Sequence, residues 1–184
     1  MKRHPLLTVV TMLVGAFVAL ASLSAPASAN HLNSWATAGA ACVPVGQTSS
    51  AHLVFNSAGD AGFAAGTVGE IILTCPVVPT IDSASTLTIT YRDTDGTGTG
   101  ATIIAALRRK SVTTGSVVTI GTVNTNAGPV VTGYGTMGTF LNSCSPLAFD
   151  FNNYVYYVQI NIRRTSTVQQ PLFGAASLNF GGIC

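Results

Sequence analysis

The sequence predicts an all-β protein: an antiparallel β-sandwich or jelly roll of about eight to ten strands, with a closed β-barrel as the alternative. Three observations predict it. Apolar and polar residues alternate with period two along several stretches, and clusters of Gly, Asn, Asp and Pro separate those stretches. In addition, no window of about 12 residues keeps the 3.6-residue period of a helix. Little helix is therefore expected after the first 29 residues.

The clearest strand is expected at 154–164, where Tyr156, Val158 and Ile160 point one way and the residues between them point the other. Its length predicts a central position in a sheet. The Gly-rich segment 128–138 shows no such alternation and is expected to be a mobile loop. Further strands are expected at 52–55, 66–75, 86–91, 101–110, 116–123 and 172–180, with turns at 56–60, 93–100, 124–129 and 152–153.

Residues 1–29 have the three parts of a secretory signal peptide. A positive start at 1–4 precedes an apolar run of 15 residues, and the segment ends in Ala27-Ser28-Ala29. This predicts cleavage before Asn30 and indicates a bacterial signal. An uncleaved anchor is disfavoured because a spanning helix needs about 20 apolar residues. The mature chain, 30–184, is therefore expected to be a single disulfide-containing β domain without a membrane span, secreted or on the cell surface.

Cleavage also changes the charge of the protein. Removal of Lys2 and Arg3 leaves six basic and six acidic residues, so the mature chain is formally neutral and has no long-range field to attract nucleic acid. The polar surface must therefore come mainly from hydroxyl groups, which 22 threonines and 12 serines among the 155 mature residues supply. A hydroxyl-coated sheet with few charges lacks the usual protection against edge-to-edge pairing. This composition favours a protein that works in an assembly or on a surface.

The mature chain has four cysteines. An even number in an exported protein predicts two disulfides, for which three pairings exist. Cys42–Cys75 together with Cys144–Cys184 is favoured because each bond then joins neighbouring segments. A zinc site is disfavoured because the chain has no Cys-x-x-Cys motif.

Short motifs are spread over most of the mature chain: Ala-Cys-Val-Pro at 41–44, Ile-Leu-Thr-Cys-Pro at 72–76, Gly-Thr-Gly-Ala at 98–101, Ala-Leu-Arg-Arg at 106–109 and Tyr-Tyr-Val-Gln-Ile at 156–160. Together these motifs resemble uncharacterised secreted bacterial β-sandwich proteins. The resemblance implies an exported β-sandwich and no known activity.

The loop at 92–98 is the best candidate for a metal site. Asp93 and Asp95 are spaced like the first ligands of a calcium loop, in which oxygens at alternate positions face one cation. An EF-hand is excluded because the twelfth position from Asp93 is Ile104 and not Glu. The favoured alternative is a hairpin turn built on Asp95-Gly96. No cofactor is therefore expected, with calcium as the alternative.

The polar side of 154–164 suggests a site for carbohydrate. Tyr157, together with Trp35, is a candidate for stacking on sugar rings, with Gln159 or Asn161 beside it to bind hydroxyl groups. The favoured interpretation is that both faces of the sheet are covered and Tyr157 belongs to the core, because a sandwich buries aromatic residues readily.

Two basic clusters stand out, Arg108-Arg109-Lys110 and Arg163-Arg164. Successive residues of a strand point to opposite faces, so neither cluster is expected to form one patch. Both are interpreted as solvated strand ends.

Catalytic signatures are weak. The mature chain has two histidines, His31 and His52, no Gly-x-Ser-x-Gly elbow, and an even cysteine count that argues against a free thiol. Nothing selects a carboxylate pair such as Glu70 and Asp95 for glycoside hydrolysis. A non-catalytic protein is favoured.

Two classes of function therefore remain. The first is an exported structural or adhesive protein of a surface or matrix, which acts by self-association or attachment. The second is a secreted lectin-like carbohydrate-binding module, calcium-assisted in one version, with Tyr157, Gln159 and Trp35 as ligand-binding residues. The first is favoured by export, neutrality and the hydroxyl-rich composition. An exposed strand edge would indicate assembly, and a concave face would indicate ligand binding.

Overall fold

The computed structural model describes residues 34–142 and 145–180. The expected signal peptide at 1–29 and its cleavage site lie outside these residues. So do Cys144 and Cys184, and their pairing stays a prediction.

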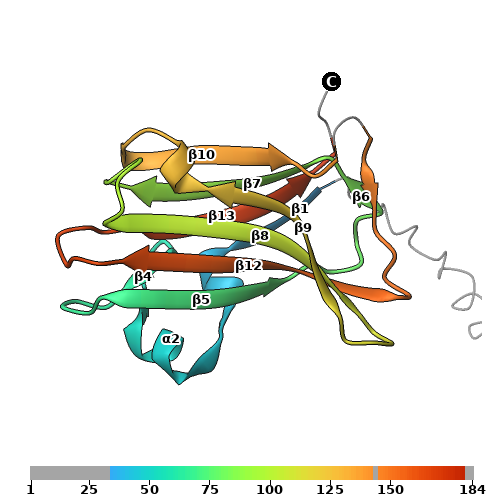
Figure 1. Ribbon diagram of the computed structural model, residues 1–184, viewed down its shortest axis with the longest axis horizontal. Coiled ribbons are helices and arrows are strands. Elements are labelled where there is room, and N and C mark those ends of the chain that lie inside the picture. The colour runs from blue at the N-terminus through green and yellow to red at the C-terminus, as the bar shows by residue number, and fades with distance from the viewer. Residues whose placement is uncertain (1–33, 143–144, 181–184) are drawn as a thin grey trace, which may run out of the picture. The chain divides into compact units, whose positions relative to one another are not determined.

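The described residues form two antiparallel sheets packed face to face (Figure 1). The expected β-sandwich is confirmed, and the alternative of a closed barrel is wrong, because no ladder joins the two sheets in the described part of the chain. Sheet A contains β1 (Ser34–Ala38), β3 (Leu53–Phe55), β4 (Ala61–Phe63), β7 (Thr86–Asp93), β10 (Val131–Phe140) and β13 (Leu172–Asn179). Sheet B contains β2 (Val43–Pro44), β5 (Gly69–Pro76), β8 (Ala101–Ser111), β9 (Val117–Asn124) and β12 (Tyr154–Arg164).

A small third sheet pairs β6 (Ser83–Ala84) with β11 (Leu147–Ala148). In sheet A, β7 and β13 are central and β10 is an edge strand, while β1 and β4 pair with different parts of β13. In sheet B, β12 lies between β5 and β8, and β9 is an edge strand. The central position expected for 154–164 is therefore confirmed.

The core lies between the sheets and takes alternate residues from both. Along β12, burial alternates, so that Tyr156, Val158 and Ile160 face the core and the residues between them face outward. Leu87 and Ile89 of β7 reach the same core from sheet A. Period-two burial on both facing sheets is what a sandwich requires, and it leaves the opposite side of each sheet for other uses.

One short helix protects an edge of sheet B. The helix α2 (Gly46–His52) packs against β5 beyond the end of β2, and the buried hydroxyl of Ser49 accepts a 2.9 Å hydrogen bond from the amide of Ile72. The amide of Val45 donates to the carbonyl of Ile72 at 2.8 Å. These bonds satisfy backbone groups that an unpaired edge would leave open to another chain. No helical period is visible in this part of the sequence, because α2 has only seven residues.

Besides α2, the described residues contain two 3-10 helices of one turn, η1 (Gly39–Ala41) and η2 (Thr125–Ala127). Within 34–142 and 145–180, no helix is long and apolar enough to cross a membrane.

The expectation of a mobile loop at 128–138 is wrong. Most of that segment belongs to β10, which pairs with β7 from Val131 to Phe140 and has a bulge between Val131 and Gly135. The strand escaped detection because three glycines interrupt it, so that few side chains are left to show an alternation. Pairing with β7 overrides the weak strand propensity of glycine.

The expected disulfide between Cys42 and Cys75 is confirmed, with an S–S distance of 2.04 Å. Both half-cystines are buried, and Cys75 lies on β5. The bond joins the chain just before β2 to the strand with which β2 pairs. A buried disulfide agrees with folding in an oxidising compartment.

Candidate functional site

The outward side of sheet B is the first candidate surface. We call it the outer face, and in Figure 1 its strands β5, β12, β8 and β9 form a layer in front of β7 and β13. On β12 the half-buried Tyr157 lies between Pro76 of β5 and Arg108 of β8, its direct cross-strand neighbours. The outer face consists of Glu70, Ile72, Thr74, Pro76, Thr102, Ile104, Ala106, Arg108, Tyr157, Gln159, Asn161 and Arg163.

A row of polar side chains continues from Tyr157 along this face. Gln159 Nε2 donates to Asn161 Oδ1 at 2.8 Å, and Asn161 Nδ2 donates to Glu70 Oε1 at 3.0 Å. Gln159 Oε1 and Glu70 Oε2 accept no hydrogen bond from any residue that the structure describes. These two hydrogen bonds hold the side chains of Gln159, Asn161 and Glu70 in place. Gln159 Oε1 and Glu70 Oε2 are left to accept hydrogen bonds from a ligand or from water. Glu70 was not foreseen as a partner, because it is 91 residues from Asn161 in the chain.

Trp35 does not share this surface. It is 6% exposed and belongs to the core, because it faces inward from β1 opposite Leu178 of β13. The expectation that Trp35 stacks on a sugar beside Tyr157 is therefore wrong. Tyr157 and Trp35 belong to different sheets.

The Asp93 and Asp95 loop is held by protein donors. The carboxylate of Asp93 is fully buried and accepts from the Thr125 hydroxyl at 2.6 Å and from the Asp95 amide at 3.0 Å. Asp95 Oδ2 accepts from the amides of Gly100 and Ala101 at 2.5 and 3.1 Å. These contacts stabilise the loop by the ordinary chemistry of Asp in turns. In the described residues no group of three or more His, Cys, Asp or Glu side chains is placed to hold a metal ion.

The loop is also not the hairpin turn that its sequence suggested. It leads from β7 in sheet A to β8 in sheet B, so it crosses from one layer to the other. Gly96 has a positive φ of 59°. Gly98 has no room for a side chain, because a Cβ there would lie 2.3 Å from Asp95 Oδ2.

Neither basic cluster forms one patch, as expected, because successive residues of each strand lie on opposite faces. Arg108 belongs to the outer face, whereas the Arg109 guanidinium lies 4.8 Å from the centre of the Tyr154 ring. Arg163 is exposed, but Arg164 is only 4% exposed, so its interpretation as a solvated strand end is wrong. The signal was present in the sequence, since Arg164 has the same parity as the inward-facing residues of β12.

Arg164 is instead a structural residue. Its guanidinium donates to the carbonyls of Thr67, Ala64 and Gln169 at 2.6, 2.9 and 3.1 Å. It also stacks on Phe63, with 4.6 Å between Cζ and the ring centre. Burial lowers the pKa of Arg164, because desolvation disfavours the charged form.

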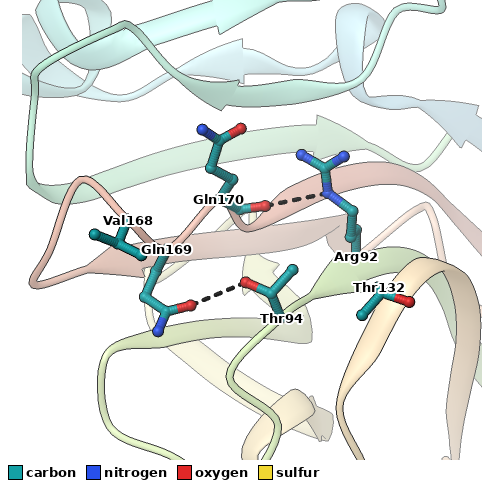
Figure 2. Close-up of a pocket in the computed structure, with 6 residues that line it drawn as sticks. All are labelled: Arg92, Thr94, Thr132, Val168, Gln169 and Gln170. Carbon is teal, nitrogen blue, oxygen red and sulfur yellow. Dashed lines mark hydrogen bonds between the residues drawn. The ribbon is translucent and has the colours of Figure 1, made fainter.

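A cavity of about 460 Å³ lies at the end of the sandwich where β7 meets the loop between β12 and β13 (Figure 2). Its walls come from three separate segments of the chain. They are Arg92 and Thr94, Thr132 of β10, and Val168, Gln169 and Gln170 of the loop. Sequence reasoning did not find it, because Arg92 and Gln170 are 78 residues apart.

Another buried carboxylate lies near this cavity. Asp60 accepts hydrogen bonds from Asn56 Nδ2 at 2.6 Å and from the hydroxyl of Tyr134 on β10. The bond to Asp60 is the main reason that the pKa of Tyr134 is raised, with partial burial adding to it and the positive charge of Arg92 acting in the opposite direction. The carboxylate of Asp60 is therefore already committed to partners within the protein.

Comparison with known proteins gives no family assignment. No family model and no curated protein matches the chain. Among solved structures, it is similar to carbohydrate-binding module CBM36 in complex with calcium and xylotriose (TM-score 0.44, 10% identity, 79% of this chain and 99% of that one).

It is also similar to a CBM36-1 domain of a multidomain xylanase from the hindgut metagenome of Trinervitermes trinervoides (TM-score 0.43, 10% identity, 82% and 100% covered). A family two carbohydrate esterase from Cellvibrio japonicus matches with TM-score 0.38 and 14% identity over 80% of this chain, which covers 34% of the esterase. At these scores and identities the similarities assign no function.

Proposed function

We propose that this protein is an exported, non-catalytic β-sandwich that attaches to glycans through the outer face of sheet B. The single observation that carries the proposal is the position of Tyr157 on the same uncovered face as the hydrogen-bonded row of Gln159, Asn161 and Glu70. An aromatic ring covers the apolar side of a sugar, while fixed amide and carboxylate groups bind its hydroxyls. Attachment of this kind unites the adhesive and the lectin-like interpretations of the sequence.

Binding suits this face better than hydrolysis. Glycoside hydrolysis uses two carboxyl groups that flank the scissile bond. Among the described residues, Glu70 is the one carboxylate of the outer face, and Asn161 already donates to it. We therefore assign Glu70 a role in binding sugar hydroxyls.

Replacement of Tyr157 tests the proposal directly. The purified protein is screened on a glycan array with and without calcium, and the hits are then titrated by calorimetry. We expect Tyr157→Ala to weaken binding by about tenfold or more, since loss of an aromatic contact removes stacking as well as apolar burial. Tyr157→Phe keeps the ring and should retain binding.

Val155→Ala is the matched control, because Val155 is exposed two residues from Tyr157 on the same strand and side. It should leave affinity unchanged. An array without hits in both conditions, or equal affinity for Tyr157→Ala and the parent protein, would contradict the proposal. Hits that need calcium would instead support the calcium-assisted version.

Self-association is a second candidate function, and the edges of the sandwich favour it. The edge strands β9 and β10 have eight and ten residues, and neither contains a charged residue or a proline. Charges and prolines are the usual devices that keep edges from pairing with another molecule. One bulge lies at each edge, between Val131 and Gly135 on β10 and opposite Leu107–Arg108 on β9, and the two strands also approach each other near Gly121 and Thr139.

A lysine on β10 tests this second function. If edges pair, the parent protein should sediment as oligomers at high concentration, and Thr136→Lys should shift it toward monomer because a charge must then be buried in the joint. Thr113→Lys, at the exposed turn between β8 and β9, adds the same charge away from the edge strands and should change nothing. A parent protein that stays monomeric at every concentration in sedimentation velocity would contradict self-association.

A further inference from the structure

The cavity of about 460 Å³ in Figure 2 has one positively charged residue in its lining. Arg92 is the one charged residue among those that line it; the others are Thr94, Thr132, Val168, Gln169 and Gln170. Its volume falls in the range of roughly 300–1,000 Å³ that is typical of small-molecule sites. The cavity lies beside β7 and β10 of sheet A, whereas Tyr157 belongs to the outer face of sheet B.

The guanidinium of Arg92 is held by one hydrogen bond and forms no ion pair with the residues that the structure describes. Its Nε donates to the carbonyl of Gln170 at 3.3 Å. Its two terminal nitrogens make no hydrogen bond or ion pair with the residues that the structure describes. In Figure 2 they project on the same side as the Gln170 amide. The N–H groups of those nitrogens are therefore available to a ligand.

None of the neighbouring acids forms an ion pair with Arg92, because each carboxylate is directed at other donors. Asp93 accepts from Thr125 on the buried side of β7, and Asp95 accepts from backbone amides. Asp60 accepts from Asn56 and Tyr134. Bonds to neutral donors leave these three carboxylates charged, so an anionic ligand would be held by direct hydrogen bonds to the unpaired N–H groups of Arg92 and not by a net positive field.

The walls are held in place by their own contacts. Thr94 Oγ1 donates to Gln169 Oε1 at 2.9 Å, and Gln169 Nε2 donates to Asp95 Oδ1 at 3.3 Å. The carbonyl of Gln169 also accepts from the buried Arg164 at 3.1 Å. The loop at 168–170 is thereby tied to β7 and to β12, so a ligand would not have to order it.

We propose that this cavity binds the carboxylate of an acidic sugar residue, a uronic acid, with Arg92 as the anchoring group. One guanidinium matches the two oxygens of a planar carboxylate through paired N–H donors, and the described lining residues include no second cation for a doubly charged phosphate. Thr132 and Gln170 also line the cavity, and their polar side chains can bind ring hydroxyls. Val168, 82% exposed, adds apolar contact at the rim.

Titration with glucuronate and with its neutral counterpart glucose tests this site. We expect glucuronate to bind about tenfold or more tightly than glucose, since hydrogen bonds to a charged group are stronger than neutral ones. Arg92→Gln should remove that difference, and Arg92→Lys should keep only part of it because lysine lacks the fork. Lys110→Gln removes an exposed positive charge elsewhere and should leave the preference intact.

Chemical-shift mapping of the parent protein keeps the test decisive if Arg92→Gln does not fold. Glucuronate should perturb the amides of 92, 94, 132 and 168–170. Equal binding of glucuronate and glucose, perturbation elsewhere only, or equal competition by inorganic phosphate would each overturn the assignment. Tyr157→Ala should leave the preference for glucuronate unchanged, so that failure here and failure of the outer-face proposal are distinguishable.

Discussion

Replacement of Arg164 by methionine is expected to cost about 3 kcal/mol of unfolding free energy. Three carbonyls, of Thr67, Ala64 and Gln169, would lose a charged donor worth about 1.5–3 kcal/mol each. The gain from no longer burying a charge offsets part of this loss, since the effective cost of desolvating an ion is several kcal/mol. Urea unfolding and thermal unfolding measure the effect, which should lower Tm by roughly 6–12 °C.

The neighbouring arginine is the natural control for this prediction. Arg163 is exposed on the other side of the same strand, and Arg163→Met should change stability by no more than about 0.5 kcal/mol. Arg164→Lys keeps the charge, but the lysine ammonium cannot donate to three carbonyls from one plane. Its loss of unfolding free energy should therefore lie between those of Arg163→Met and Arg164→Met. Equal losses for Arg163→Met and Arg164→Met would show that the three hydrogen bonds contribute little.

Arg164 also illustrates how far the sequence predicts this structure. Alternation along 154–164 correctly assigns faces, because a central strand buries every second residue whatever its partners are. The alternation alone predicts that Arg164 faces the core, whereas its charge favours a position in solvent. Burial of that charge depends in part on two carbonyls that lie 97 and 100 residues away in the chain, which local pattern cannot reveal.

The candidate sites were likewise predictable within one strand but not between segments that are distant in the chain. Tyr157 and Gln159 were predicted from one strand and lie together on the outer face. Glu70, which completes the row, and Gln170, which faces Arg92, come from strands or loops whose positions only the fold determines. Trp35 was misplaced because β1 has five residues, too few to show which side of the strand meets the core.

Loss of the Cys42–Cys75 disulfide is expected to have a comparably large effect. The bond closes a stretch of 33 residues, which corresponds to about 4 kcal/mol in the chain-entropy model. The variant with both Cys42→Ala and Cys75→Ala isolates this bond, whereas a reducing agent would also act on the predicted Cys144–Cys184 pair. Urea unfolding of this double variant against the parent protein measures the loss.

The same variant links stability to association, because the disulfide secures the protected edge of sheet B. Without it, β2 is held to β5 by a two-residue ladder and α2 by the Ser49 and Val45 contacts with Ile72. Opening of that segment would expose the β5 edge, so we expect the double variant to associate more readily than the parent protein in light scattering at the same concentration. A loss below about 1 kcal/mol with unchanged scattering would mean that the hydrogen bonds of α2 and β2 suffice to hold this edge.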